Sequence, residues 1–534
     1  MITNDWQAAQ CFVGDIPGEV ITKALGPGGI TDHGQVKVAY TRRLSAEDLA
    51  GPVGISVTAT TLQRFVPKAF EVRLTVIGQQ MFPIAIHAST EAARTDWRCD
   101  AGSQHRSPDR LAGSGDRCCD GGGDGHNAGK RHHMTVLIEG RDWASRAAAL
   151  AEELVAAGKL SSPEWHKAVL EVPRHVFVPS YYVHRDGGMV AAGATDEQGR
   201  AQWLDTVYSN TALITKLAQD TAGIPPVFLS SSSTPGLMTR MLETLDVHDE
   251  QRVLEIGTGT GYNAALLSHR LGAANVFSID IEPDLIDLAR TRLAELGYHP
   301  TLVAGDGAAG LPEHVPFDRI IATCSVPAIP WAWVEQTTLG GIILTDIKLG
   351  LNAGNLLRLT RTCPHRAEGR FEAGQAAFMH LRHTPGFDGR VPYTRAPHDN
   401  PITEHTTTLD PRTPWTNPVV WFLTALRIGP HYRLGYTGSN PRHGPDAVCL
   451  STPDGSRSEI TLTPNTDGSH TVHDTGHARL WSHLEDAHHL WDAAGRPDWP
   501  RLGLAVTPQT QTLYADEPGN TIAIVKSETN QEAD

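Results

Sequence analysis

Residues 253–267 read VLEIGTGTGYNAALL, and this stretch decides how the rest of the chain is interpreted. A short apolar run is followed by three glycines on alternate positions, Gly257, Gly259 and Gly261, and then by a run with helical character. Glycines in such a turn let the backbone pass close to a ligand, and the N–H groups at a helix start favour a polar or anionic group. The stretch therefore predicts a strand, a ligand-binding turn and a helix.

The sequence around this turn alternates between strand-like and helix-like runs from about residue 250 to 347. In the second helical run Pro283 suits the first turn and Gly297 suits the exit. Alternation of this kind predicts an α/β fold with a doubly wound parallel sheet and helices on its faces. The runs at 355–360 and 376–381 are expected to add antiparallel edge strands. The expected parallel strands are RVLEIG (252–257), NVFSID (275–280), PTLVAGD (300–306), FDRIIAT (317–323) and GGIILTD (340–346).

Acidic residues stand where such a fold would contact a nucleoside. Glu255 precedes the first glycine by two positions, and Asp280 ends the second strand, where a carboxylate can accept both hydroxyls of a ribose. Asp306 ends the third strand, where it can accept a hydrogen bond from an adenine amine, and Gly307 allows the ring to approach. The spacing G-x-G-x-G differs from the G-x-G-x-x-G of dinucleotide binders.

Each of these features also has a purely structural explanation. The glycines can serve a tight turn alone, and Asp280 can act as a helix cap. Asp306 can be a turn former, because Asp-Gly is a common turn pair. These alternatives stay open on the sequence alone.

This combination of an acid before the turn, three alternate glycines and an acid at the end of each of the next two strands resembles the class I S-adenosylmethionine-dependent methyltransferases. The resemblance implies a Rossmann-like sheet and S-adenosyl-L-methionine as cofactor. The cofactor-binding residues that it implies are Glu255, Gly257, Thr258, Gly259, Gly261, Asp280, Asp306 and Gly307.

Further motifs, in matching order, resemble the protein L-isoaspartate O-methyltransferases and cover about residues 134–350. They are VPRHVFVP (172–179), SSSSTPGLMTRML (230–242), GDG (305–307) followed by PFDRIIAT (316–323), and the loop IATCSVPAIP (321–330). Two departures stand out from that family pattern. Thr234 and Gly236 flank Pro235 where other residues are usual, and residues 186–204 read as an insertion on the substrate side.

The resemblance implies methyl transfer to an aspartyl or isoaspartyl carboxylate. Such a carboxylate is ionised at neutral pH and needs no general base, so catalysis is mainly alignment. By resemblance, the hydroxyl of Ser233 orients the acceptor, with Ser232 and Thr234 as further candidates. Serine runs often precede helices, so Ser233 can also be explained as an N-cap. The ester then closes to a succinimide when the neighbouring backbone amide nitrogen displaces methanol.

Composition limits the partners and the compartment. Lys and Arg number 45 against 60 Asp and Glu, a formal charge of −15, which argues against a nucleic-acid partner. The seven cysteines show no regular spacing, as expected for reduced thiols, and no apolar run is long enough to span a membrane. The N-terminus lacks the features of a signal peptide. A cytoplasmic location without a membrane partner is predicted.

The first part of the chain carries a second resemblance. Residues 65–98 resemble a central piece of ATP-grasp ligases that tailor ribosomal peptides, and Lys68 and Arg73 match the positions that serve nucleotide binding there. The acidic metal-binding segment that should follow is absent, so ligase activity is not expected. Residues 100–133 hold almost no large apolar side chains and predict a disordered linker. The glycine-rich context also argues against a metal site among Cys118, Cys119, His126, His132 and His133, and no metal is predicted.

The predicted organisation has five parts. They are a truncated ATP-grasp-like fragment (1–99), the linker (100–133), the methyltransferase domain (134–388), a small C-terminal α+β accessory domain (389–524) and a polar tail (525–534).

The resemblances favour tailoring of a ribosomally made peptide, with an ATP-grasp ligase and its precursor peptide as partners. General repair of isoaspartyl proteins is the alternative activity. A hypothesis of another class is a non-catalytic module that binds S-adenosylmethionine and a peptide.

Overall fold

The structure is a computed structural model that describes residues 142–185, 188–194, 197–218, 227–350, 353–383, 402–438 and 444–525. Of the preceding part it describes only the backbone of eight strands, β1 (Ile2–Thr3), β2 (Val20–Ala24), β3 (Gly29–Asp32), β4 (Gln35–Val38), β5 (Arg42–Arg43), β6 (Thr60–Arg64), β7 (Glu71–Ile77) and β8 (Gln80–Ile86). Lys68, the side chain of Arg73, the linker at 100–133 and the tail after residue 525 lie outside the described residues. The predictions made for them stay predictions.

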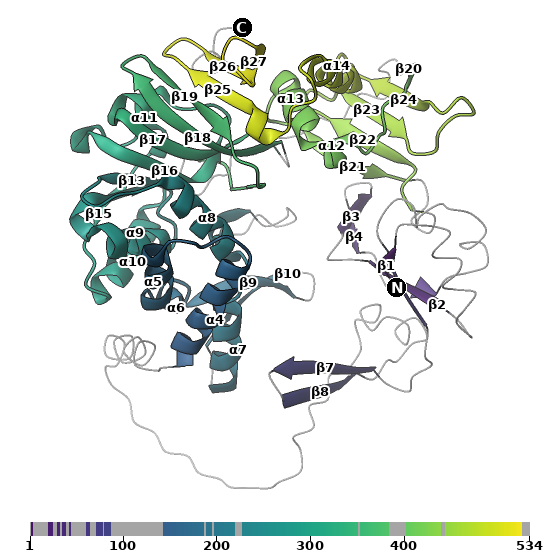
Figure 1. Ribbon diagram of the computed structural model, residues 1–534. Coiled ribbons are helices and arrows are strands. Elements are labelled where there is room, and N and C mark those ends of the chain that lie inside the picture. The colour runs from purple at the N-terminus through teal and green to yellow at the C-terminus, as the bar shows by residue number, and fades with distance from the viewer. Residues whose placement is uncertain are drawn as a thin grey trace.

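A doubly wound parallel sheet forms the centre of the chain, as predicted (Figure 1). Its strands lie in the order β15-β14-β13-β16-β17, with the strand of the glycine turn in the middle. Because all four strand pairs are parallel, the carboxyl ends of the strands share one edge, where ligands bind in such sheets. The strands are β13 (Val253–Ile256), β14 (Val276–Asp280), β15 (Thr301–Ala304), β16 (Phe317–Val326) and β17 (Thr337–Lys348).

Helices connect these strands and cover the sheet. The predicted second helix is α10 (Pro283–Glu295), with Pro283 in its first turn and Gly297 leaving the helix at φ 78°. Its apolar face, including Leu285, Ala289 and Leu293, is buried, as its 3.6-residue period requires. The other connecting helices are α9 (Tyr262–Leu271) and α11 (Trp331–Gln336), with short 3₁₀ turns at Ala273–Asn275, Gly307–Ala309 and Pro312–His314.

Antiparallel strands continue the sheet beyond β17. The strand expected at 355–360 is β18 (Gly354–Cys363), but it is not an edge, because β19, β25, β26 and β27 follow it in the sheet. The strand expected at 376–381 is wrong. This segment crosses the carboxyl ends of β16 and β17 instead, and its β-pairing is one bridge between His380 and Ser325. The added strands are β19 (Arg366–Phe371), β25 (Leu502–Val506), β26 (Gln511–Ala515) and β27 (Thr521–Val525).

A helical layer and a small sheet precede the glycine turn. Helix α4 (Asp142–Ala156) begins this layer, and Gly158 follows it with φ 65°. The small sheet has the order β10-β9-β11-β12, and part of the insertion-like stretch forms β10. The elements are α5 (Pro163–Glu171), α6 (Arg174–Phe177), β9 (Ser180–Arg185), β10 (Gly188–Gly193), α7 (Glu197–Val207), β11 (Leu213–Leu217), β12 (Phe228–Ser232) and α8 (Pro235–Leu245).

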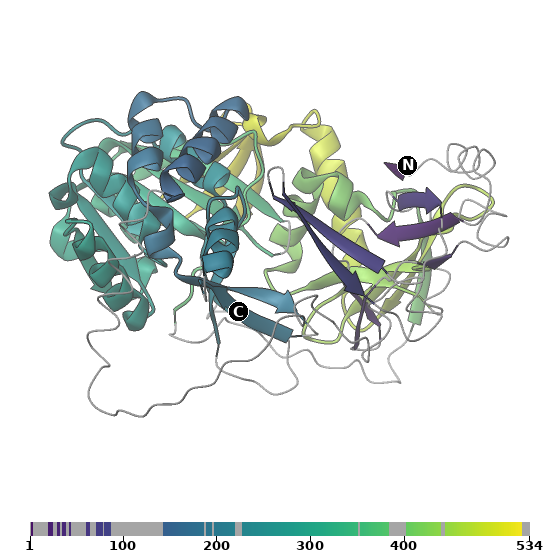
Figure 2. The same cartoon turned by 90° about the horizontal axis from the view of Figure 1, so that it is seen from below.

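The C-terminal part adds a five-stranded antiparallel sheet that lies beside the parallel core in both views (Figures 1 and 2). One apolar core runs from the parallel sheet into this second sheet, through the C-terminal helices at residues 418–428 and 480–493. Since β25–β27 return to the large sheet, the predicted accessory domain at 389–524 shares a sheet with the methyltransferase region. Its elements are β20 (Ile402–Thr407), α12 (Thr413–Thr416), α13 (Pro418–Ile428), β21 (Arg433–Thr437), β22 (Ala447–Ser451), β23 (Arg457–Thr461), β24 (His470–Thr475), α14 (Leu480–Ala493) and a 3₁₀ turn at Trp499–Arg501.

A buried glutamine joins the C-terminal strands to the loop after β16. The side chain of Gln511 on β26 accepts from the backbone N–H of Ile329 at 2.9 Å and donates to its carbonyl at 2.8 Å. Gln511→Ala leaves both buried backbone groups unpaired, at about 1–3 kcal/mol each. We expect urea unfolding to show a loss of roughly 2–4 kcal/mol. Gln509→Ala, at an exposed position of the adjoining turn, is the matched control, and equal stability of the two variants would contradict the prediction.

No helix in the described part of the chain is long and apolar enough to cross a membrane.

Candidate active site

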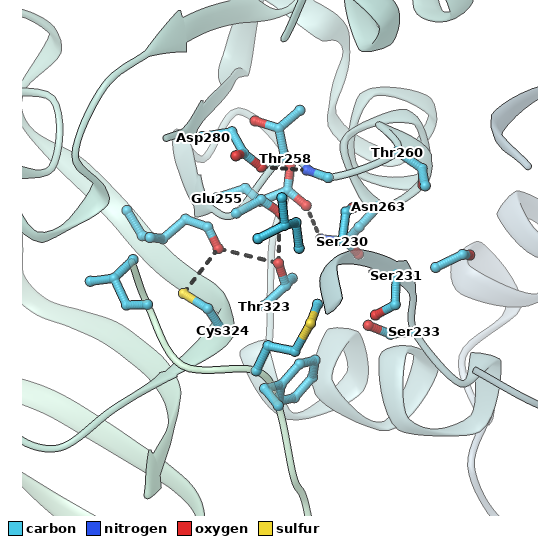
Figure 3. Close-up of a pocket in the computed structure, with 18 of the residues that line it drawn as sticks. Ser230, Ser231, Ser233, Glu255, Thr258, Thr260, Asn263, Asp280, Thr323 and Cys324 are labelled. Carbon is cyan, nitrogen blue, oxygen red and sulfur yellow. Dashed lines mark hydrogen bonds between the residues drawn. The ribbon is translucent and has the colours of Figure 1, made fainter. Parts of the chain in front are cut away.

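A cavity of about 300 Å³ opens at the carboxyl ends of the parallel strands. Four segments line most of it. They are the glycine turn with the start of α9 (255–260, 262 and 263), the end of β14 with residue 281, strand β12 with residues 233 and 234, and the segment 377–382 (Figure 3). The glycine turn and the serine run therefore face one cavity, as their predicted roles require.

The three glycines of the turn have backbone conformations that other residues rarely adopt. Gly257, Gly259 and Gly261 have φ of 96°, 52° and 88°. A Cβ on Gly257 would lie 2.7 Å from Oγ1 of Thr323, and one on Gly261 would lie 3.0 Å from Cβ of Ala289. Gly257 and Gly259 line the cavity, whereas Gly261 serves the close packing of α9 against α10.

Glu255 lies fully buried beneath the turn and organises its underside. Its carboxylate accepts from Asn263 Nδ2 at 2.8 Å and from Ser278 Oγ at 2.6 Å. The hydroxyl of Thr258 in turn lies 2.6 Å from Ser278 Oγ. Thr258 and Glu255 thus join the glycine turn to β14, and burial raises the pKa of Glu255 to about 7.

This raised pKa makes stability depend on pH. The folded chain holds the Glu255 proton more tightly than the unfolded chain, so the contribution is present below about pH 4.5 and is lost as the pH rises through about 7. At about 1.36 kcal/mol per pH unit, the difference between the folded and unfolded pKa of Glu255 corresponds to roughly 3 kcal/mol of unfolding free energy. We expect the free energy of unfolding of the wild type, relative to Glu255→Gln, to fall by this amount between pH 4.5 and 8. Parallel pH profiles of the two proteins in urea titrations would contradict this prediction.

Asp280 lies at the end of β14 and lines the cavity with 8% of its surface exposed. One carboxylate oxygen accepts from the N–H of Gly259 at 2.8 Å, and the other accepts from the N–H of Glu282 at 3.0 Å. The residue therefore fixes the glycine turn against the loop that starts α10. Burial raises the pKa of Asp280, and the two backbone N–H groups and Arg382 act against this.

Asp306 does not line the cavity, but Gly307 does. The Asp306 carboxylate accepts from the N–H of Ala308 at 2.9 Å and lies 2.8 Å from Nδ1 of His383. One of the two carboxylate oxygens therefore makes the contact expected of a turn former. The hydrogen bond from an adenine amine to Asp306 stays a prediction. A Cβ on Gly307 would lie 2.5 Å from Cγ2 of Ile256 and 3.2 Å from Cδ1 of Leu381, so a larger residue does not fit between these two apolar side chains.

The serine run divides into two sets by the alternation of the strand. Ser230 and Ser232 are 3% exposed, and their hydroxyls contact Thr215 and Arg174. Ser231 and Ser233 line the cavity and are among the side chains drawn in Figure 3. All four serines line the cavity, but the hydroxyl of Ser232 is already held by Arg174.

The N-cap explanation for Ser233 is wrong. Helix α8 begins at Pro235, and Thr234 is its N-cap. The side chain of Thr234 makes no capping hydrogen bond, although Thr234 does line the cavity, and the N–H of Gly236 in the first turn donates instead to Oδ1 of Asn210 at 2.8 Å. The hydroxyl of Ser233 is therefore not used by the helix.

Arg174, from the motif VPRHVFVP, supports the serine run from behind. Its guanidinium is fully buried and donates to the carbonyls of Val207, Ser209, Thr211 and Ser233 and to the hydroxyl of Ser232, over 2.5–3.3 Å. Burial lowers the pKa of Arg174 to about 10, so it stays protonated at neutral pH.

Sequence reasoning missed several residues of the cavity. Ser231 is recognisable from the two-residue period that places it beside Ser233. Thr323, whose hydroxyl donates to the carbonyl of Gly257 at 2.7 Å, lies in the recognised loop without an assigned role. Because a strand is expected at 376–381, no sequence signal indicates that residues 377–382 line the cavity. The described residues contain no cluster of metal-binding side chains, and Cys118, Cys119, His126, His132 and His133 lie outside them.

A doubly wound sheet with this glycine turn, and with an acid at the end of the next strand facing the cavity, defines a class I S-adenosylmethionine-dependent methyltransferase. The family model for protein-L-isoaspartate(D-aspartate) O-methyltransferase matches residues 194–368.

Two relatives agree with that match. The chain is 30% identical over 201 residues to the protein-L-isoaspartate O-methyltransferase of Ignicoccus hospitalis, covering 37% of this chain and 80% of that protein. It is 40% identical over 158 residues to the enzyme of the same name from Methylorubrum populi, covering 29% and 72%. A solved protein-L-isoaspartate O-methyltransferase is similar at 23% identity and a TM-score of 0.39, covering 70% of this chain and all of that one. The chain belongs to the protein-L-isoaspartate O-methyltransferase family.

Proposed function

We propose that the protein esterifies an aspartyl or isoaspartyl carboxylate in a peptide, using S-adenosylmethionine. The observation that carries this proposal is the single cavity with the glycine turn and Asp280 on one wall and the hydroxyls of Ser231 and Ser233 on another. An enzyme that transfers a group from a nucleoside cofactor to an anionic acceptor must hold both molecules in one cavity, so both walls are needed.

The residues around the cavity fit the cofactor. Gly257, Gly259 and Gly307 would let the cofactor approach the backbone at positions where a side chain is strained or does not fit. Asp280 would accept hydrogen bonds from the ribose hydroxyls. When bound, S-adenosylmethionine supplies a methyl group on a positively charged sulfur, which is an electrophile. Thr258 and Glu255 would hold the turn from below through Ser278.

The serine hydroxyls would position the acceptor. Ser233 would donate a hydrogen bond to the acceptor carboxylate and turn one oxygen towards the methyl group, with Ser231 beside it. Because the carboxylate is already ionised at neutral pH, the chain needs to supply orientation rather than a base.

The substrate proposed is an aspartyl residue in a ribosomally made peptide. Two features support a tailoring enzyme over general repair. The N-terminal sequence resembles ATP-grasp ligases that act on such peptides, and residues 502–525 extend the catalytic sheet with strands of their own. An ATP-grasp ligase and its precursor peptide are the partners that follow from this proposal.

Mass spectrometry separates this proposal from its alternatives. The protein is incubated with S-adenosylmethionine and either a precursor peptide modified by the ATP-grasp ligase or a synthetic isoaspartyl peptide. We expect the precursor peptide to gain one methyl group and then to lose methanol as the succinimide closes. Transfer to the isoaspartyl peptide alone would support repair. Cofactor binding without transfer to either peptide would support a non-catalytic module.

The role of Ser233 can be tested with the same assay. A hydrogen bond to a charged acceptor contributes about 1.5–3 kcal/mol, so Ser233→Ala should slow methyl transfer about ten- to a hundredfold while leaving the affinity for S-adenosylhomocysteine unchanged. Ser145→Ala, at an exposed position on α4, is the matched control. A loss in Ser231→Ala and not in Ser233→Ala would move the orienting role to Ser231.

A further inference from the structure

A buried ionic cluster lies beside Asp280, and its centre is Glu282, which is 4% exposed. One carboxylate oxygen of Glu282 lies 2.8 Å from Nζ of Lys216 on β11. The other forms an ion pair with Nη1 of Arg382 from the segment that crosses the cavity. Neither the glycine turn nor the serine run explains why three charged side chains meet at this point.

The cluster joins three separate parts of the cavity wall. Nη2 of Arg382 donates to the carbonyl of Leu229 on β12 at 3.1 Å, so the arginine contacts the strand that carries the serines. Glu282 is the residue whose N–H donates to Asp280. Arg382 therefore links the serine strand, through Glu282, to the loop that holds Asp280.

The charges that surround Asp280 are mostly negative. Glu282 faces it from its own loop and Glu255 from β13, and the Cys324 thiol on β16 is uncharged because burial raises its pKa. Lys216 and Asp284 lie on the outer side of Glu282. Among the described residues that line the cavity, Arg382 is the only Lys or Arg. Burial and the charge of Glu282 raise the pKa of Asp280, and the charge of Arg382 lowers it.

We propose that Arg382 is a positioning residue for cofactor binding, which stabilises the Asp280 carboxylate through its charge while Glu282 and the Leu229 carbonyl hold it in place. This inference rests on the proposed role of Asp280 towards the ribose. Arg382 acts through Asp280 and needs no contact with the cofactor itself.

The proposal predicts opposite pH effects for the two partners of one ion pair. Removing the positive charge of Arg382 raises the pKa of Asp280, so the carboxylate is protonated, and accepts fewer hydrogen bonds, at a higher pH. Removing the negative charge of Glu282 lowers the pKa of Asp280 and has the reverse effect. A purely structural role of the ion pair would weaken binding in both variants without this opposition.

Isothermal titration calorimetry with S-adenosylhomocysteine from pH 5 to 8.5 tests the proposal on the full chain. We expect affinity to fall on acidification in every protein, with the midpoint displaced to higher pH in Arg382→Gln and to lower pH in Glu282→Gln. A displacement of one pH unit gives about a tenfold loss on the acid side of the profile. Arg382→Lys should keep the wild-type midpoint, and Arg290→Gln on the exposed face of α10 is the surface control.

The outcomes are distinct. Midpoints that move the same way in Arg382→Gln and Glu282→Gln, or that do not move, overturn the inference. If Arg382→Gln does not fold, the downward displacement in Glu282→Gln and the unchanged midpoint in Arg382→Lys decide it alone. Failure of the wild type to bind S-adenosylhomocysteine at pH 8 overturns the assignment of the site instead. Glu255 is present in all variants, so its own titration cancels in the comparison.

Discussion

Asp280→Ala should lower the affinity for S-adenosylhomocysteine by at least about a hundredfold, as measured by calorimetry at pH 8. The carboxylate is expected to accept two ribose hydroxyls, and hydrogen bonds to a charged group contribute about 1.5–3 kcal/mol each. The substitution also removes the acceptor for the N–H groups of Gly259 and Glu282, so the glycine turn loses its attachment to the next loop. Both effects weaken the same site.

Two further variants separate these effects. Asp280→Asn keeps the shape but places an amide N–H2 against one of the two backbone donors, so it should also bind poorly. Asp287→Ala, an exposed position on α10, should bind as the wild type does. Unchanged affinity in Asp280→Ala would remove Asp280 from the cofactor site.

Arg174→Met should cost at least about 3 kcal/mol of unfolding free energy and should also slow methyl transfer. The methionine fills most of the volume but leaves four carbonyls and the Ser232 hydroxyl without their donor, and unpaired buried polar groups cost about 1–3 kcal/mol each. Because two of these acceptors belong to Ser232 and Ser233, the serine run should shift as well.

Urea unfolding and methyl-transfer kinetics test this prediction together. The control is Arg146→Met, which breaks a partly exposed ion pair with Asp205 and should cost less than about 1 kcal/mol. Equal losses of stability in the two variants would show that the buried contacts of Arg174 do not stabilise the fold.

The parallel core was predictable from the sequence because its signals are local. Each strand is a short apolar run, and α10 carries both of its boundary residues in the sequence, Pro283 and Gly297. The glycine turn and Asp280 were predictable for the same reason, since they follow directly from the ends of two strands.

Features that depend on distant segments were not predictable. The run at 376–381 is short and mostly apolar, as a strand can be, but β19 already pairs with β18, and the backbone of the run bonds instead to Ser325 and to the carboxylate of Asp346. The bonds between Gln511 and Ile329 and between Arg382 and Glu282 join residues far apart in the chain. No pattern within a short window reports such contacts.

The return of the last strands to the large sheet has a consequence for biosynthesis. A ribosome makes β19 long before it makes β25, so the hydrogen-bonding edge of β19 stays open while residues 372–501, about a quarter of the protein, are translated. Open edges invite pairing with other chains. Until the last three strands are made, the nascent chain therefore carries a strand edge to which another chain can add.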